Sequence, residues 1–293
     1  NRRRGDFRQA RGGGDSQDAL AGCMTATATR LIYESLIDAP LLVGNLPESQ
    51  VFNRPGLRMP KAECALSFDQ KLGHLYEDAL GAIIEASPDL DCLASHLQVF
   101  DLSGITLGEM DFVVFDRAKK RYIHLELAVK FYLAVEIDGA WQFPGPDPRD
   151  NWQRKLERLC SHQLRLSGLD EAKVLLKERF GIQKMAVEHL IYGRVFYPVT
   201  SVERPAIEAM HSSAQTGRWL FVSQVNEYLN KIETVYLIEK PLWAVPLTSS
   251  LLSTLRVMPI DDLRSMAAER CVMFVPPASR EPYFLVPDGW PDL

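Results

Sequence analysis

The chain has 293 residues, of which 46% are hydrophobic and 24% charged, and its formal net charge is −5. This composition is ordinary for a soluble globular protein and allows a large hydrophobic core. It does not suggest a protein that coats nucleic acid by bulk positive charge, and no apolar run approaches the roughly 18 residues of a transmembrane helix. The five cysteines are scattered without metal-binding spacing, so we expect reduced thiols in the cytoplasm.

Residues 1–23 differ in composition from the rest of the chain. They contain five arginines and a glycine-rich patch but almost no aliphatic side chains. The functional reading is a basic arm for nucleic acid; we prefer a disordered leader, with Met24 as the natural start. We then divide the chain into a core at 24–200, which includes an N-terminal helical segment, and an extension at 201–293 packed on that core.

Two helices are expected before the central region. Residues 25–42 have an amphipathic pattern, and residues 71–86 place six apolar side chains on one stripe. Asp69 is the expected N-cap of the second helix, which Pro88 ends. Glu77 lies in this helix away from the clearest apolar stripe, so by itself it is equally well a solvated acid.

A β-hairpin at residues 107–133 organises the rest of the chain. Its strands, 110–115 and 121–133, are rich in β-branched and aromatic residues, and DRAKK is the turn between them. Asp111, Glu126 and Lys130 interrupt these apolar runs. Ionised groups on a buried strand are costly unless they are paired or bind a metal. Two acids and a lysine on adjacent strands suit a divalent-metal site for phosphodiester hydrolysis.

The order G-x-x-D, strand, turn, strand, E-x-x-x-K resembles the core of the PD-(D/E)XK, restriction-endonuclease-like superfamily. The strings LGHLYEDAL, LGEMDFVVFD and HLELAVKFYL resemble a bacterial family of uncharacterised function usually placed in that superfamily, over roughly residues 65–200. The resemblance implies an α/β fold with an αβββαβ core, in which helices flank a mixed central sheet. It also implies a Mg²⁺ or Mn²⁺ cofactor, and a role for Glu77 in holding the metal or organising the site.

One position departs from this pattern. The superfamily motif places an acid two residues before the lysine, whereas Ala128 occupies that position here and the acid is Glu126. A regular strand would separate Glu126 from Lys130 by about 13 Å, and only a β-bulge would shorten that distance. Glu109 shares a strand face with Asp111 and is a spare acid for the site.

Residues 149–184 carry a local surplus of positive charge. Nine Lys and Arg residues face five acids there, on an expected helix at 151–168 and a second one between Asp170 and Gly181. We expect Arg154, Lys155 and Arg158 to face the phosphates of nucleic acid, although a solvated helix face is the alternative. The resemblance adds Gln163, which with Lys155 would lie beside the substrate backbone.

The C-terminal part contains no fingerprint of a nucleotide-binding or serine-hydrolase site. We expect a buried strand at 185–199 with a close backbone approach at Gly193, a helix near 215–230, and short strands that include LWAVPL. Three tryptophans, at 219, 243 and 290, are interpreted as core residues rather than stacking platforms.

Three hypotheses follow for the function. In the first, Asp111 and Glu126, with Glu77, bind Mg²⁺ or Mn²⁺ in a nuclease that cleaves nucleic acid, with DNA as the expected substrate, and Lys130 assists the reaction. In the second, the protein binds nucleic acid or a protein partner without cleavage. In the third, Asp111, Glu126 and Lys130 form a buried ion-pair network of structural value only.

Overall fold

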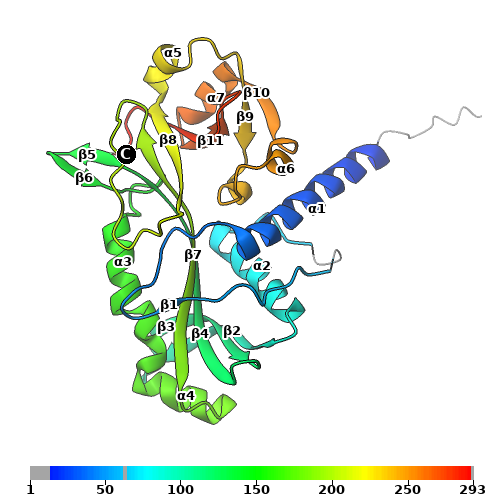
Figure 1. Cartoon of the computed structure of the whole chain (residues 1–293), viewed down its shortest axis with the longest axis vertical. Coiled ribbons are helices and arrows are strands. Elements are labelled where there is room, and N and C mark those ends of the chain that lie inside the picture. The colour runs from blue at the N-terminus through cyan, green and yellow to red at the C-terminus, as the bar shows by residue number, and fades with distance from the viewer. Residues whose placement is uncertain (1–13, 62–64, 292–293) are drawn as a thin grey trace, which may run out of the picture.

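Two long strands rich in β-branched and aromatic residues form the centre of the molecule. In the computed structural model, which describes residues 14–61 and 65–291 and side chains from residue 25 onward, β4 (Arg121–Leu133) and β7 (Met185–Pro198) pair in parallel. Their sequences lack a clear polar face because helices cover both sides of the pair, as is usual for parallel strands. The structure is therefore a mixed α/β fold with a large central sheet flanked by helices (Figure 1).

The central sheet runs in the order β10-β9-β11-β12-β8-β7-β4-β3-β2, and β1 pairs with the outer part of β7. Pairing is antiparallel for β2–β3 and β3–β4, and parallel for β4–β7 and β7–β8. The other strands are β1 (Gln50–Val51), β2 (Leu90–Phe100), β3 (Thr106–Asp116), β8 (Gln215–Phe221), β9 (Thr234–Ile238), β10 (Arg256–Pro259), β11 (Val272–Val275) and β12 (Tyr283–Val286), with a separate hairpin of β5 (Val135–Ile137) and β6 (Ala140–Gln142).

Helices on opposite faces of the sheet complete two hydrophobic layers. Helices α1 (Gly14–Asp38) and α2 (Leu72–Ala86) pack on one face of β4 and β7. Helix α3 (Trp152–Ser161) packs on the other face, and the 3₁₀ helix η1 (Gln163–Gly168) continues it toward α4 (Asp170–Phe180). The remaining helical segments are η2 (Val222–Gln224), α5 (Val225–Tyr228), η3 (Lys240–Leu242), α6 (Ser249–Leu252) and α7 (Ile260–Ala267).

A close backbone approach joins the two central strands at Gly193. This residue pairs with Lys130 and has a φ of 137°, and a Cβ placed on it would lie 1.6 Å from the Lys130 carbonyl oxygen. Only glycine fits this position without displacing the neighbouring strand. The expected close approach at Gly193 is confirmed.

Several expected boundaries hold and others do not. The helix expected at 71–86 is α2, but its N-cap is Lys71, whereas Asp69 instead accepts a hydrogen bond from the Ser67 hydroxyl. The first helix begins at Gly14, inside the segment interpreted as a leader, while residues 1–13 lie outside the described part.

Two expectations for the C-terminal part are wrong. Residues 215–230 were expected to be helical, yet they begin with β8, and LWAVPL was expected to be a strand but is not one. Residues 215–221 form a strand because they pair with β7 on one side and β12 on the other, and this tertiary pairing outweighs their local preference.

The C-terminal region shares the central sheet with the region before it. Strand β8 pairs with β7, and the strands beyond it extend the sheet to β10. Trp219, Trp243 and Trp290 are 3%, 8% and 2% exposed, so the interpretation of these tryptophans as core residues is confirmed. In the part of the chain that the structure describes, no helix has the length and apolarity needed to cross a membrane.

Candidate active site

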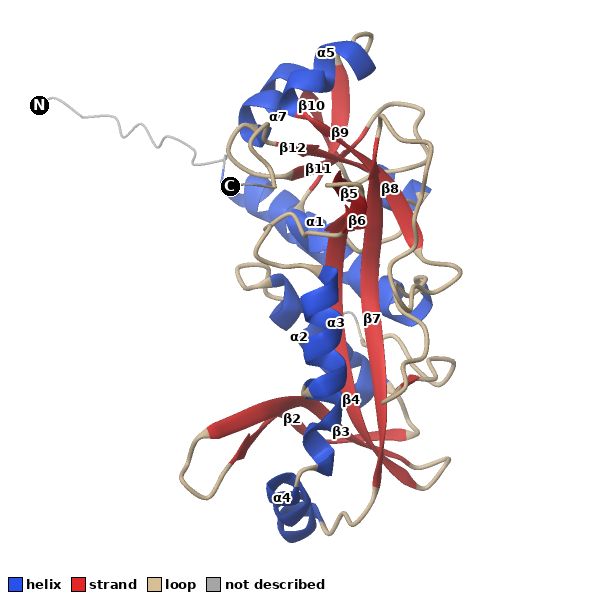
Figure 2. Ribbon diagram, turned by 90° about the vertical axis from the view of Figure 1, so that its left-hand side faces the viewer, coloured by secondary structure: helices blue, strands red, loops and turns tan. Residues whose placement is uncertain are grey.

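A fork in the central sheet brings the predicted acids together. The β3–β4 ladder ends at the pair Phe112–Leu125. Beyond this pair β3 stays with β2, whereas β4 stays with β7, so the strands diverge and the β2–β3 hairpin leaves the sheet as an arm (Figure 2). Asp111 and Glu126 are the first residues past the last pair, one on each side of the fork.

The two carboxylates span the fork through crossed hydrogen bonds. The Asp111 backbone N–H donates to Glu126 Oε1 at 3.3 Å, and the Leu127 backbone N–H donates to Asp111 Oδ2 at 2.8 Å. Burial raises the pKa of both carboxyl groups to about 8, and the negative charge of Glu126 contributes to the rise at Asp111. Two buried acids that resist ionisation beside each other form a site that a cation would stabilise.

His124 is a member of the site that the sequence analysis did not identify. Its ring is completely buried, with Nε2 2.7 Å from Glu126 Oε1 and Nδ1 3.1 Å from the Ser167 hydroxyl. Burial lowers the pKa of His124 to about 4, so the ring is neutral at pH 7. When Glu126 is ionised it can only accept, so the ring then donates from Nε2 to Glu126 and accepts at Nδ1 from the Ser167 hydroxyl. The signal was the spacing of two, which places His124 and Glu126 on one face of β4.

The lysine nearest the buried acids comes from α3. Lys155 Nζ donates to Gln163 Oε1 at 2.8 Å, and Gln163 Nε2 lies 3.4 Å from Glu126 Oε2. Burial and repulsion by Lys130 lower the pKa of Lys155, while the charges of Glu126 and Asp111 oppose that shift. The structure therefore brings together Lys155 and Gln163, as expected, and connects both to the carboxylates at the fork.

Lys130 lies away from the acids, as its spacing from Glu126 on a regular strand predicts. Its Nζ lies 2.6 Å from Asp150 Oδ2, in the loop that precedes α3. The β4–β7 register is regular from Glu126 to Lys130, so no bulge shortens the distance between them. Within the described residues Glu126 is hydrogen-bonded to the neutral His124 ring and forms no salt bridge with Lys130, which pairs with Asp150. The hypothesis of a structural Glu126–Lys130 ion pair is therefore wrong.

Glu77 approaches the site from α2. Its side chain is 14% exposed, with Oε2 2.9 Å from His74 Nδ1 and 3.7 Å from His96 Nδ1. Its charge contributes to the raised pKa values of both Asp111 and Glu126, which places it near the pair. Among residues 14–61 and 65–291, however, no three His, Cys, Asp or Glu side chains converge closely enough to bind a metal ion by themselves.

The other predicted residues lie farther out. Glu109, on the arm, is 3.3 Å from His96 Nδ1. Arg154 and Arg158 are exposed on α3, and neither forms an ion pair with a residue that the structure describes. Of the three basic residues expected to face phosphate, Lys155 alone is connected to the buried acids by hydrogen bonds among the residues that the structure describes.

Comparison with known proteins gives one match. The family model described as "Domain of unknown function (DUF1853)" matches residues 56–275, which include every residue of the fork and of α3. No curated protein and no solved structure matches the chain.

Proposed function

The chain belongs to DUF1853, a family named for its unknown function, and from the fork we propose that it is a metal-dependent nuclease that hydrolyses phosphodiester bonds of nucleic acid, with DNA as the expected substrate. One observation carries the proposal: two adjacent buried carboxyl groups with pKa values near 8 lie beside a lysine that is itself partly desolvated. Strongly perturbed groups of opposite charge concentrated in one place are typical of catalytic sites.

The donor set fits a hard divalent cation. Asp111 and Glu126 would hold Mg²⁺ or Mn²⁺, and Glu77 would act from α2 as a more distant acid. Mg²⁺ in enzymes is commonly held by one or two carboxylates, with water and substrate phosphate as the other ligands, so a third protein ligand is not required. When bound, such an ion supplies Lewis-acid polarisation of a phosphoryl oxygen.

The other residues at the fork would orient the Glu126 carboxylate and neutralise charge on the phosphate. The neutral His124 ring would orient the ionised Glu126 carboxylate by donating its Nε2–H, and the Ser167 hydroxyl would hold the other ring nitrogen. Gln163 holds the Lys155 ammonium beside Glu126, where its positive charge would stabilise charge that develops on the phosphate. This role replaces the one that the sequence pattern gave to Lys130.

The order of the elements also supports the proposal. Apart from the short β5–β6 hairpin between β4 and α3, the helix α2, the antiparallel strands β2, β3 and β4, the helices α3 to α4 and the parallel strand β7 have the αβββαβ order expected of restriction-endonuclease-like nucleases. Asp111 and Glu126 come from the second and third of these strands, just past the last β3–β4 pair.

Cleavage assays with a matched pair of variants test this function. End-labelled single- and double-stranded DNA and RNA are incubated with Mg²⁺, Mn²⁺ or EDTA. We expect metal-dependent cleavage that Glu126→Gln abolishes and that Glu136→Gln, an exposed acid on β5, leaves unchanged. Cleavage that survives Glu126→Gln or persists in EDTA would contradict the proposal.

A second candidate is a protein of the same fold that binds nucleic acid or a protein without cutting. The formal net charge of −5 and the presence of Ala128 at the usual position of the acid, two residues before Lys130, favour it. Its signature would be salt-dependent DNA binding without cleavage under any metal condition, weakened by charge reversal at Arg154 and Arg158.

A further inference from the structure

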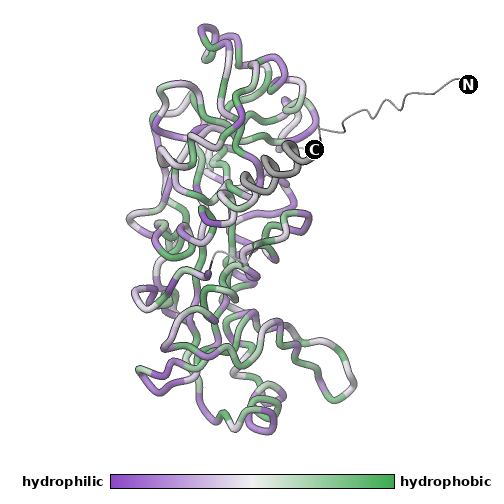
Figure 3. Tube along the Cα trace, turned by 90° about the vertical axis from the view of Figure 1, so that its right-hand side faces the viewer, coloured by the Kyte–Doolittle hydropathy of each residue, from purple (hydrophilic) through white to green (hydrophobic). Residues whose placement is uncertain are grey.

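The arm formed by β2 and β3 ends in an exposed apolar tip at residues 100–105. Phe100, Leu102 and Ile105 are 47%, 103% and 65% exposed, and they are three of the nine large hydrophobic side chains exposed in the described part. Figures 2 and 3 show the arm projecting from the body of the molecule. A contiguous apolar group at the end of a projecting element is typical of an interaction site.

The tip is held in one conformation. Asp101 Oδ1 accepts hydrogen bonds from the Ser103 backbone N–H at 2.8 Å, the Ser103 hydroxyl at 2.6 Å and the Ile105 backbone N–H at 2.8 Å. The Asp101 N–H also donates to the Ile105 carbonyl at 2.9 Å. The turn therefore presents its apolar side chains together with one carboxylate, whose pKa the Ser103 hydroxyl lowers. Such a preorganised turn loses little conformational entropy when it binds.

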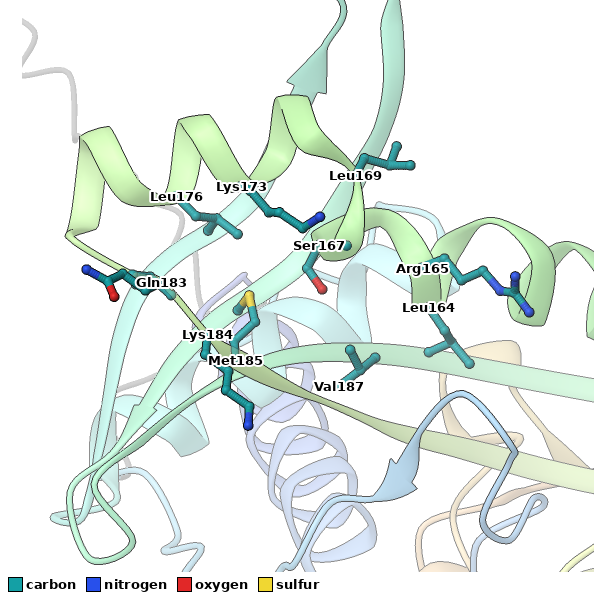
Figure 4. A pocket seen from close by; sticks show the side chains of 12 residues that line it. Leu164, Arg165, Ser167, Leu169, Lys173, Leu176, Gln183, Lys184, Met185 and Val187 are labelled. Atoms are coloured by element: carbon teal, nitrogen blue, oxygen red, sulfur yellow. The ribbon is translucent and has the colours of Figure 1, made fainter.

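A cavity of complementary character lies between η1, α4 and β7 (Figure 4). Its volume is about 500 Å³, and its apolar lining includes Leu164, Leu169, Leu176, Ile182, Met185 and Val187. Arg165, Lys173 and Lys184 add three cationic groups to the lining. Lys184 forms no ion pair with any residue in 14–61 or 65–291, whereas Arg165 and Lys173 are each paired with an exposed or partly exposed acid.

We propose that the tip of one molecule binds this cavity in a second copy of the chain, and that the exchange is reciprocal in a twofold dimer. The tip is convex, apolar and acidic, and the cavity is concave, apolar and basic, so the two match in shape, polarity and charge. Leu97, Val99 and Met110 of the arm pack with Ala172 and Leu176 of α4, which fixes the arm on its own molecule, while the tip projects outward (Figure 2), where a second copy can meet it. Reciprocal exchange uses both features twice and closes the assembly.

Analytical ultracentrifugation of the full chain over a concentration series tests the tip. We expect a concentration-dependent dimer whose dissociation constant rises at least tenfold in Leu102→Ser. The matched control is Val202→Ser, which removes an equally exposed side chain at 95% from a loop away from the arm and should leave the dimer unchanged. Asp101→Asn keeps the acceptor that holds the turn but removes its charge, and should weaken the dimer several-fold at low salt.

A second variant and a mixing experiment identify the contact itself. Leu169→Glu adds an acid to the cavity at the N-cap of α4, where negative charge is compatible with the helix, and it should likewise raise the dissociation constant of the dimer at least tenfold. Leu102→Ser has an intact cavity and Leu169→Glu an intact tip, so an equimolar mixture regains one of the two contacts. We therefore expect tighter association in the mixture than either variant shows alone.

Three results would overturn the proposal. The wild-type chain could be monomeric at every concentration, the dimer could survive Leu102→Ser and Leu169→Glu, or the mixture could fail to associate although both variants retain the wild-type melting temperature. Growth beyond the dimer would overturn the twofold arrangement.

Discussion

Two carboxyl groups buried next to each other determine the energetics of the fork. We expect Glu126→Gln to raise the free energy of unfolding of the metal-free protein at pH 8 by about 1 kcal/mol, or about 2–4 °C in melting temperature. The amide keeps an oxygen for the His124 N–H but removes a charge that burial disfavours. Thermal melts in EDTA measure the change. A clear fall would mean that the ionised Glu126 carboxylate stabilises the fold, contrary to the role proposed here.

The same groups predict how stability depends on pH. Between pH 4 and 8 the folded chain keeps protons on Asp111 and Glu126 that the unfolded chain has lost, so the free energy of unfolding falls as pH rises and levels off above about 8. The fall is at most about 1.4 kcal/mol per pH unit for each group. His124, whose pKa is lowered to about 4, has the opposite effect, but only below about pH 6.5.

Denaturant melts in EDTA between pH 6.5 and 8.5 isolate the carboxyl contribution. The double variant Asp111→Asn/Glu126→Gln should remove most of the slope in this range. Because a metal binds the ionised carboxylates, stabilisation by Mg²⁺ or Mn²⁺ should grow with pH in the wild-type chain and be absent from the double variant. An equal slope in both proteins would show that the two carboxyls titrate normally.

The two lysines near the fork have separable effects on cleavage. Lys155→Met should reduce metal-dependent cleavage by about 10²–10³-fold, the usual cost of removing one group that stabilises charge in a transition state. Lys130→Met should have a smaller effect, because its ammonium is paired with Asp150. Cleavage rates of both variants at saturating metal show which lysine assists the reaction. A larger loss with Lys130→Met would favour Lys130, the lysine assigned from the sequence.

Sequence patterns reveal charged residues on buried strands but not their partners. Asp111 and Glu126 stand out because they interrupt apolar runs, and the structure places them on either side of the fork. Lys130 stands out for the same reason, yet its partner, Asp150, lies in a loop that no strand pattern describes. Lys155 is connected to Glu126 through Gln163, and the packing of α3 on the sheet brings it there. The spacing of residues along β4 therefore could not predict which lysine lies beside the acids.

At the scale of elements, the strand assignments of the central hairpin hold because alternation and β-branching are local signals. The fork does not follow from a local pattern, because it forms where β3 pairs only with β2, and β4 only with β7, beyond the pair Phe112–Leu125. The helix expected near 215–230 fails for a related reason. Its sequence tolerates a helix, but as β8 it joins β7 to β12, and sheet completion outweighs local preference.

The parallel pairing of β4 and β7 depends on one glycine. Gly193→Ala should destabilise the chain by more than about 3 kcal/mol, because the new Cβ would meet the Lys130 carbonyl at 1.6 Å and φ would remain at 137°. Gly56→Ala is the control, since nothing lies within 4 Å of a Cβ placed there. Thermal melts and soluble yield measure both, and equal stability of the two variants would show that β7 can shift to accommodate the methyl group.

At the scale of the whole molecule, the regions before and after residue 200 supply hydrogen-bond partners to each other's buried side chains. The buried Arg194 side chain on β7 donates from Nη2 to the Val245 carbonyl at 2.7 Å and from Nε to the Trp243 carbonyl at 3.3 Å. In the opposite direction, the indole N–H of Trp219 donates to the Ala134 carbonyl at 2.9 Å, and that of Trp290 to the Gly145 carbonyl at 3.2 Å. These bonds cross the boundary that the sequence analysis drew at residue 200.

Truncation after residue 200 should therefore prevent folding. The fragment would lose β8, the neighbour of β7 in the sheet, and would leave the Arg194 guanidinium buried or exposed without its carbonyl acceptors. Phe196 would also lose its packing against Phe284, whose ring centre is 4.5 Å away. Circular dichroism melts of the fragment and the full chain test this, with no cooperative transition expected for the fragment. A cooperative melt of the fragment would instead show that the core expected at 24–200 is an independent domain, and that β8 to β12 are an addition to its sheet.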